Sequence, residues 1–496
     1  GSRYEYVVKY NPARREVLYS TYFGPSGTGS AAAGFFQGFD IYDEEISVFT
    51  SGESGFPVNR SLPGSCAPDS GHKIQAAIFT LSKMGVLTAS SYIGGPGRIH
   101  PVSIRRRERE FYLFGLVESY SKDSIQAITE DAIERTTDFG LNRSVWTSIF
   151  GIVTVDLDST KYLTYLWPSK GGEGFDFTGS LVNGGLPKMH VRDIDESVVF
   201  VYPKSAICGT NPPLRRTLIT SEAISHKRGV YIVKYSRSVN DYEYATWYGF
   251  ADRNFQLNDS YLRENGDLFL FGATSPRSGS FSLPGNWKTL GTEIPKNPDS
   301  CGITIGVLDH EGVSRGGFEI YTGLPQRSGS IAASMCGMLL FTGRLSYAFH
   351  HLQNRGQTLP LLHAFDTVSI ANDEYSIDDQ YLIAIDADRM DFLYSSYWNH
   401  PFKTRLQSPM LLTRPNGYTL YQDGYTLDAP SNLSRPIDWR ILDCKADTGM
   451  FSVDLRVPTP CWKLSCTLST IDSLRIERAR GYGEPREFDV VFELVN

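Results

Sequence analysis

The residues best suited to chemistry in this 496-residue sequence are three histidines that lie close together. His350 and His351 are adjacent in "YAFHHLQNRG", and His363 follows them. Imidazole groups can bind zinc or transfer protons. Because no His-x-x-x-His spacing and no flanking carboxylate completes a metal site, a structural role is the simpler interpretation, and acid–base chemistry is the alternative. We expect no metal site and no cofactor.

Two charged segments could bind ions. Residues 386–391, "DADRMD", begin like a calcium loop, but the glycine at the sixth position and the glutamate at the twelfth are missing. Residues 103–110, "SIRRRERE", contain four arginines. Both segments stand where other parts of the chain have ordinary hairpin turns, so we expect solvated turns. An acidic partner for the arginines is the alternative.

Local catalytic motifs are absent from the sequence, which has no Gly-x-Ser-x-Gly elbow, no phosphate-binding Gly-Lys loop and no paired-carboxylate signature. Aromatic residues in long connections remain as candidates. They could stack on sugar rings, anchor a protein partner, or pin the connections to the fold. The candidate binding residues are Trp146, Trp287, Tyr347, Phe349, His350, His351, His363 and Trp439.

Composition limits the possible partners. The chain is 41% hydrophobic, with a net charge of −7 and mixed acids and bases, so no long-range positive field exists and we expect no nucleic-acid partner. No apolar run approaches the roughly 18 residues of a membrane helix, so we expect no transmembrane segment. The seven cysteines form no metal-binding spacing, and their number does not decide the compartment.

An internal repeat organises the chain. A "YSTY"-like segment recurs at intervals of 70 to 83 residues, marked by Tyr22, Tyr92, Tyr165, Tyr248, Tyr321, Tyr397 and, in degenerate form, Thr467. An apolar segment typical of a strand precedes each marker, and the turn between them is rich in Asn, Asp, Pro, Ser and Gly, as a hairpin requires. These apolar segments are 6–10, 76–81, 150–155, 230–235, 303–308, 381–386 and 450–455.

Downstream of most markers a second hairpin ends on a glycine. These glycines are Gly52, Gly115, Gly272, Gly343 and Gly424. Seven units of four short strands predict an all-β fold, a seven-bladed β-propeller of four-stranded antiparallel blades, because each sheet is then buried between its neighbours. A row of separate β-sandwiches is the alternative. The one segment with a helical pattern is 124–140.

We expect a single propeller domain over residues 1–496. Its repeat units are approximately 4–73, 74–147, 148–228, 229–300, 301–378, 379–448 and 449–496.

The first unit resembles a known family. "YVVKYNPARREVLYSTYFGPSG", followed by a hairpin and "ESGFP" at 53–57, is similar to the bacterial β-propeller repeat family, as are "SYIGGPG" at 91–97 and "NGDLFLFGATSPRSGSFSLPG" at 265–285. The resemblance implies that the strand pair ending on glycine lines a central channel and that the "YSTY" strands lie outside. It also implies an exported or surface-attached protein: periplasmic, cell-surface or secreted.

The same strand order predicts how the ring closes and which face of the ring has the long connections. Residues 6–22 would complete a blade whose inner strands come from the C-terminal end of the chain, which closes the ring. Hairpin turns would share one face, while long connections share the other. The long connections are 53–75, 116–149, 204–229, 273–302, 344–380 and 425–449. Loops of such length usually carry function.

Three functions fit this reading. We expect a non-enzymatic propeller that binds a protein partner, or forms a subunit of a surface assembly, through its long-loop face. The alternative is a carbohydrate-binding or carbohydrate-active propeller, such as a lectin, glycosidase or lyase, with its site at the channel mouth, since propellers gather residues from several blades there. An intracellular scaffold with reduced cysteines is the third possibility.

Overall fold

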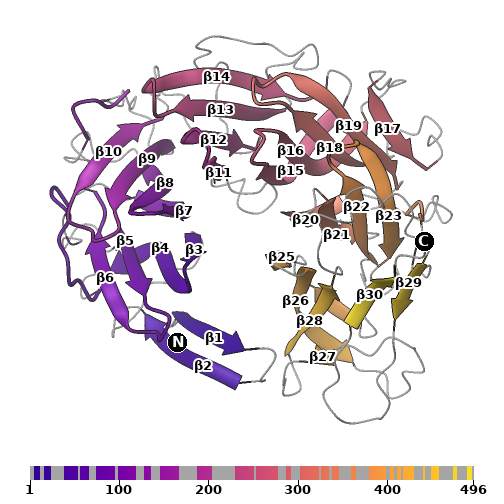
Figure 1. Cartoon of the computed structure of the whole chain (residues 1–496), viewed down its shortest axis with the longest axis horizontal. Coiled ribbons are helices and arrows are strands. Elements are labelled where there is room, and N and C mark those ends of the chain that lie inside the picture. Colours follow the sequence, from indigo (N-terminus) through magenta and orange to yellow (C-terminus); the bar gives the residue numbers. More distant parts are fainter. Residues whose placement is uncertain are drawn as a thin grey trace. The chain divides into compact units, whose positions relative to one another are not determined.

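Figure 1 shows the computed structural model of the chain, which is built from β-strands. Apart from isolated positions, the structure describes residues 5–11, 16–23, 38–53, 56–67, 74–94, 99–118, 128–135, 146–166, 187–203, 229–250, 253–276, 286–291, 302–322, 326–333, 338–345, 359–364 and 379–397, and beyond these the backbone of the strands. No helix occurs in the described residues, so the predicted all-β class is confirmed.

Contacts along the chain define two compact units. Unit 1 comprises Gly1–Leu218 with Tyr231–Thr246, and unit 2 comprises Ile219–Val230 with Trp247–Asn496. Among the described residues, no helix is long and apolar enough to cross a membrane.

Unit 1 contains one two-stranded sheet and three sheets of four strands. The two-stranded sheet pairs β1 (Glu5–Asn11) with β2 (Glu16–Phe23). The next follows the order β3 (Gly38–Tyr42), β4 (Glu45–Glu53), β5 (Ile74–Leu81) and β6 (Leu87–Tyr92). The third contains β7 (Ile99–Arg107), β8 (Glu110–Glu118), β9 (Trp146–Thr154) and β10 (Thr160–Tyr165), and the fourth β11 (Lys188–Val191), β12 (Ser197–Tyr202), β13 (Val230–Ser236) and β14 (Asp241–Tyr248).

Unit 2 contains three further sheets. The first is β15 (Arg253–Leu262), β16 (Leu268–Pro276), β18 (Gly302–Leu308) and β19 (Ser314–Tyr321), with β17 (Trp287–Leu290) added in parallel to β19. The second is β20 (Gln326–Ala333), β21 (Met338–Leu345), β22 (Asp379–Asp386) and β23 (Asp391–Tyr397). The third contains β24 (Lys403–Leu406), β25 (Met410–Arg414), β26 (Gly417–Asp428), β27 (Arg440–Ile441), β28 (Thr448–Arg456), β29 (Ser473–Ile476) and β30 (Asp489–Glu493).

The strand order confirms the predicted offset between repeat and sheet. Where a sheet contains the marker glycine, the glycine-bearing strand is second, as β4 is, and the apolar strand and the "YSTY" strand follow as third and fourth, as β5 and β6 do. The second strand of the β11–β14 sheet, β12, has no glycine. The seventh marker, Thr467, lies outside the described residues. Sheets of four antiparallel strands are consistent with a propeller.

The predicted closing pair is not found among the described strands. β1 pairs with β2, while β29 pairs with β30 and β30 with β28. Closure of a ring, and a count of seven blades, therefore stay predictions.

The pattern at 124–140 predicts a helix, and this prediction is wrong for residues 128–135, the part of the segment that the structure describes. Residues 128–135 contain a turn and no helix. Thr129 donates its N–H to the carbonyl of Leu163 over 3.2 Å, and its Oγ1 accepts the N–H of Leu163 over 3.2 Å. β10 is the last strand of its sheet, so its outward N–H and C=O groups need partners. Pairing with this edge outweighed the local helical preference.

The sheets of unit 1 pack face to face through large side chains. Phe114 and Phe150, on β8 and β9, lie 5.2 Å and 5.3 Å from Phe200 on β12, measured between ring centroids. Tyr162 on β10 stacks on Tyr235 on β13 at 5.7 Å. Aromatic pairs at such distances contribute about 0.5–1.5 kcal/mol each beyond the area they bury. These pairs fix the β7–β10 sheet against the β11–β14 sheet.

Unit 2 is held together in the same way. Phe271 on β16 lies 5.2 Å from Phe341 on β21, and Phe318 on β19 lies 4.9 Å from Phe392 on β23. Both phenylalanines of the first pair are fully buried. One apolar core therefore joins the β15–β19 sheet to the β20–β23 sheet.

In the β15–β19 sheet, the repeated glycine of the second strand lies opposite a bulge in the first. The register shifts between Leu257 and Asp259 on β15, and Gly272 pairs with Leu257. A Cβ atom added to Gly272 would lie 2.1 Å from the carbonyl oxygen of Gln256. The bulge brings the two backbones so close that only glycine fits.

This close approach predicts a large loss of stability for Gly272→Ala. The added methyl group meets backbone that cannot rotate away, so the free energy of unfolding should fall by about 3 kcal/mol, the upper end for overpacking. Gly115→Ala is the matched control, because its Cβ would lie 3.0 Å from the nearest atoms. Denaturant unfolding of both variants measures the difference. Equal losses would contradict the assignment.

Candidate functional site

Most of the predicted binding residues lie outside the described residues. These are Tyr347, Phe349, His350, His351, His363 and Trp439. For Trp146 the structure describes the backbone, which begins β9 and pairs with Glu118.

Trp287 is placed differently from the prediction. It begins β17, which lies alongside β19, instead of standing in an irregular loop. Its side chain is 8% exposed, and its ring centroid lies 5.5 Å from that of Phe250 in a T-shaped contact. The tryptophan fits against Gly317, where a Cβ atom would lie 2.8 Å from the indole ring. The ring therefore packs at the edge of a sheet, as expected for an aromatic that pins a connection to the fold, and a binding role for it stays a prediction.

The aspartate-rich segment forms a hairpin turn between β22 and β23. Asp386 Oδ1 accepts the N–H groups of Asp388 and Arg389, each over 2.9 Å. Asp388 Oδ1 in turn accepts a hydrogen bond from Arg263 over 2.7 Å. Within the described part of the chain, no group of three or more His, Cys, Asp or Glu side chains could hold a metal ion.

The arginine-rich segment is paired within the chain. Arg105 Nη1 lies 3.1 Å from Asp40 Oδ1, and Arg106 forms an ion pair with Glu45 and lies over the ring of Tyr42. Both acidic partners belong to the β3–β4 hairpin. The side chain of Arg106 is only 12% exposed, so the expected solvated hairpin is wrong for this residue.

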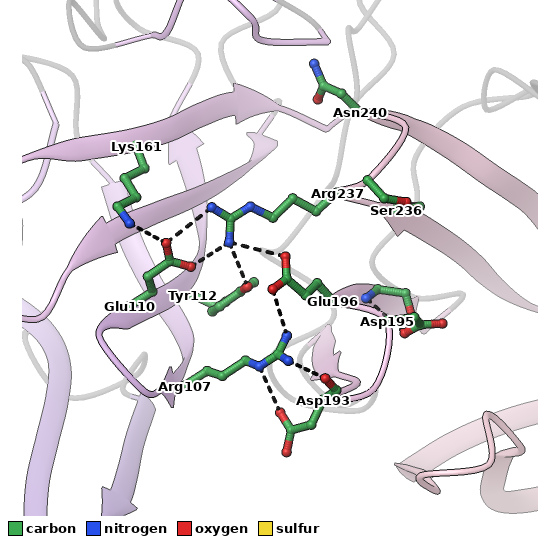
Figure 2. Close-up of polar contacts among 12 residues, drawn as sticks. Arg107, Glu110, Tyr112, Lys161, Asp193, Asp195, Glu196, Ser236, Arg237 and Asn240 are labelled. Carbon is green, nitrogen blue, oxygen red and sulfur yellow. Dashed lines mark hydrogen bonds and ion pairs between the residues drawn. The ribbon is translucent and has the colours of Figure 1, made fainter.

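Figure 2 shows an ion-pair network that joins the hairpin turns of two sheets. Arg237, after β13, donates to both carboxylate oxygens of Glu110 on β8, over 2.5 Å and 3.2 Å. Lys161 Nζ donates to the same carboxylate over 2.6 Å. Arg237 also lies 3.5 Å from Glu196, which lies 3.6 Å from Arg107. Four turns are thus tied together by charge-assisted hydrogen bonds.

The electrostatics of this network favour stability over reactivity. Burial acts to raise the pKa of Glu110, but the hydrogen bonds from Arg237 and Lys161 outweigh it, so the pKa lies below its ordinary value. Burial raises the pKa of Tyr112, whose hydroxyl accepts a hydrogen bond from Arg237 over 3.3 Å. A carboxylate held ionised and a phenol held neutral are poor groups for proton transfer near neutral pH.

A second polar cluster lies on the first strands of three neighbouring sheets. β7 contacts both β3 and β11, and Figure 1 shows these three strands on the same side of their sheets. β3 contributes Asp40, β7 contributes Arg105, and β11 contributes Lys188 and His190. We call these four residues the inner-edge cluster.

Positive charge surrounds the imidazole of this cluster. Burial, together with the charges of Arg105 and Lys188, lowers the pKa of His190 to about 3. His190 is therefore neutral at physiological pH and offers one N–H donor and one acceptor nitrogen. Together the four residues supply carboxylate, guanidinium, ammonium and imidazole groups, which can bind a polar ligand.

Local sequence patterns pointed to part of this cluster. The arginine run marked Arg105 as a possible contact for an acidic partner. Lys188 and His190 stand in "PKMHV", which matches no motif. The contact between β7 and β11 arises from packing of whole sheets, and no short-range spacing encodes it.

Comparison with known proteins finds likeness at the level of fold. No protein-family model and no curated protein matches the sequence, so the specific repeat family is not confirmed. Among solved structures, a Dyadobacter fermentans protein of unknown function is 11% identical with a TM-score of 0.38, covering 86% of this chain and 95% of that one.

Two other solved structures are carbohydrate-active proteins. An ulvan lyase of a new polysaccharide lyase family is 8% identical, with a TM-score of 0.39 and 84% coverage of both chains. A Trypanosoma rangeli sialidase is 9% identical with a TM-score of 0.36, covering 88% of this chain and 56% of that one.

This comparison contradicts the expected non-enzymatic, protein-binding propeller. The similar structures are mostly sialidases, glycosidases and a lyase, which agrees better with the alternative that we stated from the sequence. The correction concerns the class of function. The argument for a site must come from this chain's own residues.

The network of Figure 2 predicts a stability contribution that depends on pH. Glu110→Gln should lower the free energy of unfolding at pH 7 by about 2 kcal/mol, since it removes charge-assisted hydrogen bonds from a carboxylate that is 14% exposed. The folded pKa of Glu110 is lowered, so the wild-type advantage is full above the unfolded pKa of about 4.3. It is lost as the pH falls below that value through the folded pKa.

Unfolding of both proteins between pH 7 and pH 3 measures this difference. Glu44→Gln is the control, because its ion pair with Lys9 is exposed and should contribute under about 1 kcal/mol. A constant difference across the pH range would show that the carboxylate charge does not act as described.

Proposed function

We propose that this protein is a carbohydrate-binding or carbohydrate-active propeller with its site at the inner edge of its sheets, which would line the channel. The observation that supports it is the inner-edge cluster: Asp40, Arg105, Lys188 and His190 come from the first strands of three sheets of unit 1, and the middle one of these strands, β7, contacts both β3 and β11. Sites assembled from several blades are invisible to local motifs and typical of propellers.

The chemistry of the cluster suits a saccharide. Sugar hydroxyls both donate and accept hydrogen bonds, so they need carboxylates on one side and cationic or imidazole N–H groups on the other. Asp40 supplies the acceptor, and Arg105, Lys188 and His190 supply donors.

Binding is better supported than hydrolysis by these four residues. A retaining or inverting glycosidase needs two carboxyl groups about 5–10 Å apart, and the inner-edge cluster contains one, Asp40. A hydrolytic activity would need a second carboxyl group from elsewhere in the chain.

The finer architecture belongs to the same proposal. We infer seven sheets in one domain over residues 1–496, closed by pairing of the N-terminal hairpin with C-terminal strands. The β1–β2 hairpin shifts register next to its turn, between Lys9 and Tyr10, as the β5–β6 hairpin does between Thr80 and Leu81. β1 and β2 thus match the third and fourth strands of a sheet, whose first two strands must come from elsewhere.

An exported location is part of this proposal as well. It follows from the resemblance of the repeats to those of exported bacterial propellers. Glycan binding at a cell surface or in the periplasm would be consistent with it.

Asp40→Asn tests the proposed function directly. The variant keeps an acceptor but removes the charge, so glycan affinity should fall about tenfold, which corresponds to about 1.4 kcal/mol. Binding to an array of neutral and acidic glycans, with release of reducing ends as a second readout, measures it. Asp388→Asn, in the β22–β23 turn, is the control. Wild-type protein that binds and cleaves no glycan on the array would refute the proposal.

Closure predicts that the first hairpin stabilises the whole chain. Deletion of residues 1–22 should lower the melting temperature by several degrees, because a sheet would lose two strands and an edge would be exposed. Thermal unfolding followed by circular dichroism measures this. An unchanged melting temperature would argue against closure by these strands.

A further inference from the structure

We propose that four of the long connections share one task. Each places a segment along the fourth strand of its own sheet, and this cover keeps that strand from pairing with a strand of a second copy of the chain. The inference concerns the outer edges of the sheets, so it goes beyond the proposed function and does not depend on a glycan site.

The four segments share a position in the chain. Each lies in the connection between the second and third strands of a sheet, and each contacts the fourth strand of that same sheet. They are 59–62 beside β6, 129–133 beside β10, β17 beside β19, and 360–362 beside β23. We call them the edge segments. In the β11–β14 sheet the corresponding connection, 204–228, lies outside the described residues.

The edge segments contact the fourth strands at one register. In each sheet the contacted residue stands two positions before the tyrosine that marks the repeat. These residues are Ser90, Leu163, Glu319 and Ser395. Because the register is the same in four sheets, the contact is a feature of the repeat.

Asn59 takes the place of a partner strand with its side chain. Its Oδ1 accepts the N–H of Ser90 over 2.7 Å, and its Nδ2 donates to the carbonyl of Thr88 over 3.3 Å. The N–H of Arg60 donates to the carbonyl of Ser90 over 3.0 Å. A bare strand edge offers these same backbone groups to another chain. At β6 they are satisfied from within the chain.

The other edge segments satisfy the same need with different groups. Thr129 donates its N–H to the carbonyl of Leu163 and accepts the N–H of Leu163 at Oγ1. Leu362 exchanges two backbone hydrogen bonds with Ser395, of 3.0 Å and 2.9 Å, and β17 adds a short parallel strand to β19. The groups differ while the result is the same, which supports protection of the edge as the common task.

A second copy of the chain is the partner that this cover excludes. β6, "LTASSY", has no charged residue, no proline and no glycine. Two such strands could pair antiparallel without placing like charges opposite each other, and short neutral segments of this kind readily add to one another. Every copy presents the same edge, and a self-complementary edge forms a twofold dimer.

Asn59→Ala tests the inference at β6. The variant loses both side-chain hydrogen bonds to the edge, so its apparent dissociation constant for self-association should be at least about tenfold lower than that of the wild type. Sedimentation velocity over a range of protein concentrations measures it. Asn265→Ala is the matched control, because Asn265 also makes two side-chain hydrogen bonds, both to Asp267 within the β15–β16 turn.

Thr88→Lys, added to Asn59→Ala, locates the contact. Thr88 is exposed on β6, and a lysine on an edge strand opposes pairing between copies. The double variant should therefore return to the self-association of the wild type without regaining the lost hydrogen bonds. Circular dichroism checks that each variant is folded. If Asn59→Ala does not fold, Thr129→Val repeats the test at β10, since it removes the hydroxyl and keeps the shape of the side chain.

Three results would overturn the inference. One is unchanged self-association of a folded variant that has lost its edge contact. Another is equal self-association of the Asn265→Ala protein, which would assign the effect to a general loss of stability. The third is continued association of the double variant, which would place the contact on another surface. Glycan binding is measured separately, so the proposed function stands or falls on other data.

Discussion

Burial of both faces of the inner strands, of which β12 and β18 are the clearest cases, is the constraint on which the rest of the structure depends. All six residues of β12, "SVVFVY", are buried, and so are all seven of β18, "GITIGVL". A strand with no solvated face needs a neighbouring sheet on each side, because apolar surface left in water costs about 25 cal/mol per Å². The aromatic contacts of Phe200 and Phe271 meet this need within their units. Polar side chains that could bind a ligand are therefore expected on turns, connections and free edges of the sheets.

Local patterns in the sequence predicted the strands well, because the pattern that forms a hairpin lies within one short stretch of the chain. The apolar segments and the "YSTY" segments have a period and a turn chemistry that few other structures share, and they form β5 and β6, and β22 and β23. The glycine after the second hairpin was recognised as a marker, but its cause was not. Gly272 is required by a bulge on β15, whose position depends on pairing between two strands.

The failures occurred where tertiary contacts outweighed local preference. Thr129 and its neighbours have a helical pattern, yet they pair with the edge of β10. Trp287 was expected in an irregular connection, yet it begins a short strand, and its indole ring lies against Gly317. In both cases an unpaired sheet edge was available. The sequence around each residue has no local pattern that would show where the edge of a sheet lies.

The candidate site shows the same limit. "SIRRRERE" marked Arg105 as unusual, but the pairing of Arg106 and Arg107 could not be read from it, because their partners lie on hairpins about 60 and 90 residues away. His190 was not singled out at all. Only the packing of β7 against β11 brings it near Arg105.

Net charge describes the field far from a protein. The value of −7, with acids and bases well mixed, led us to expect no nucleic-acid partner. Close to the surface the balance differs, since the Debye length is about 8 Å at physiological salt and distant carboxylates are screened. In the turns of unit 1, Glu110 and Glu196 are already paired with cations. Acidic residues paired in this way contribute to the total charge, while a cation at short range offsets their local field. The net charge therefore bears on long-range attraction of nucleic acid, and the ligand of a local site has to be argued from the residues around it.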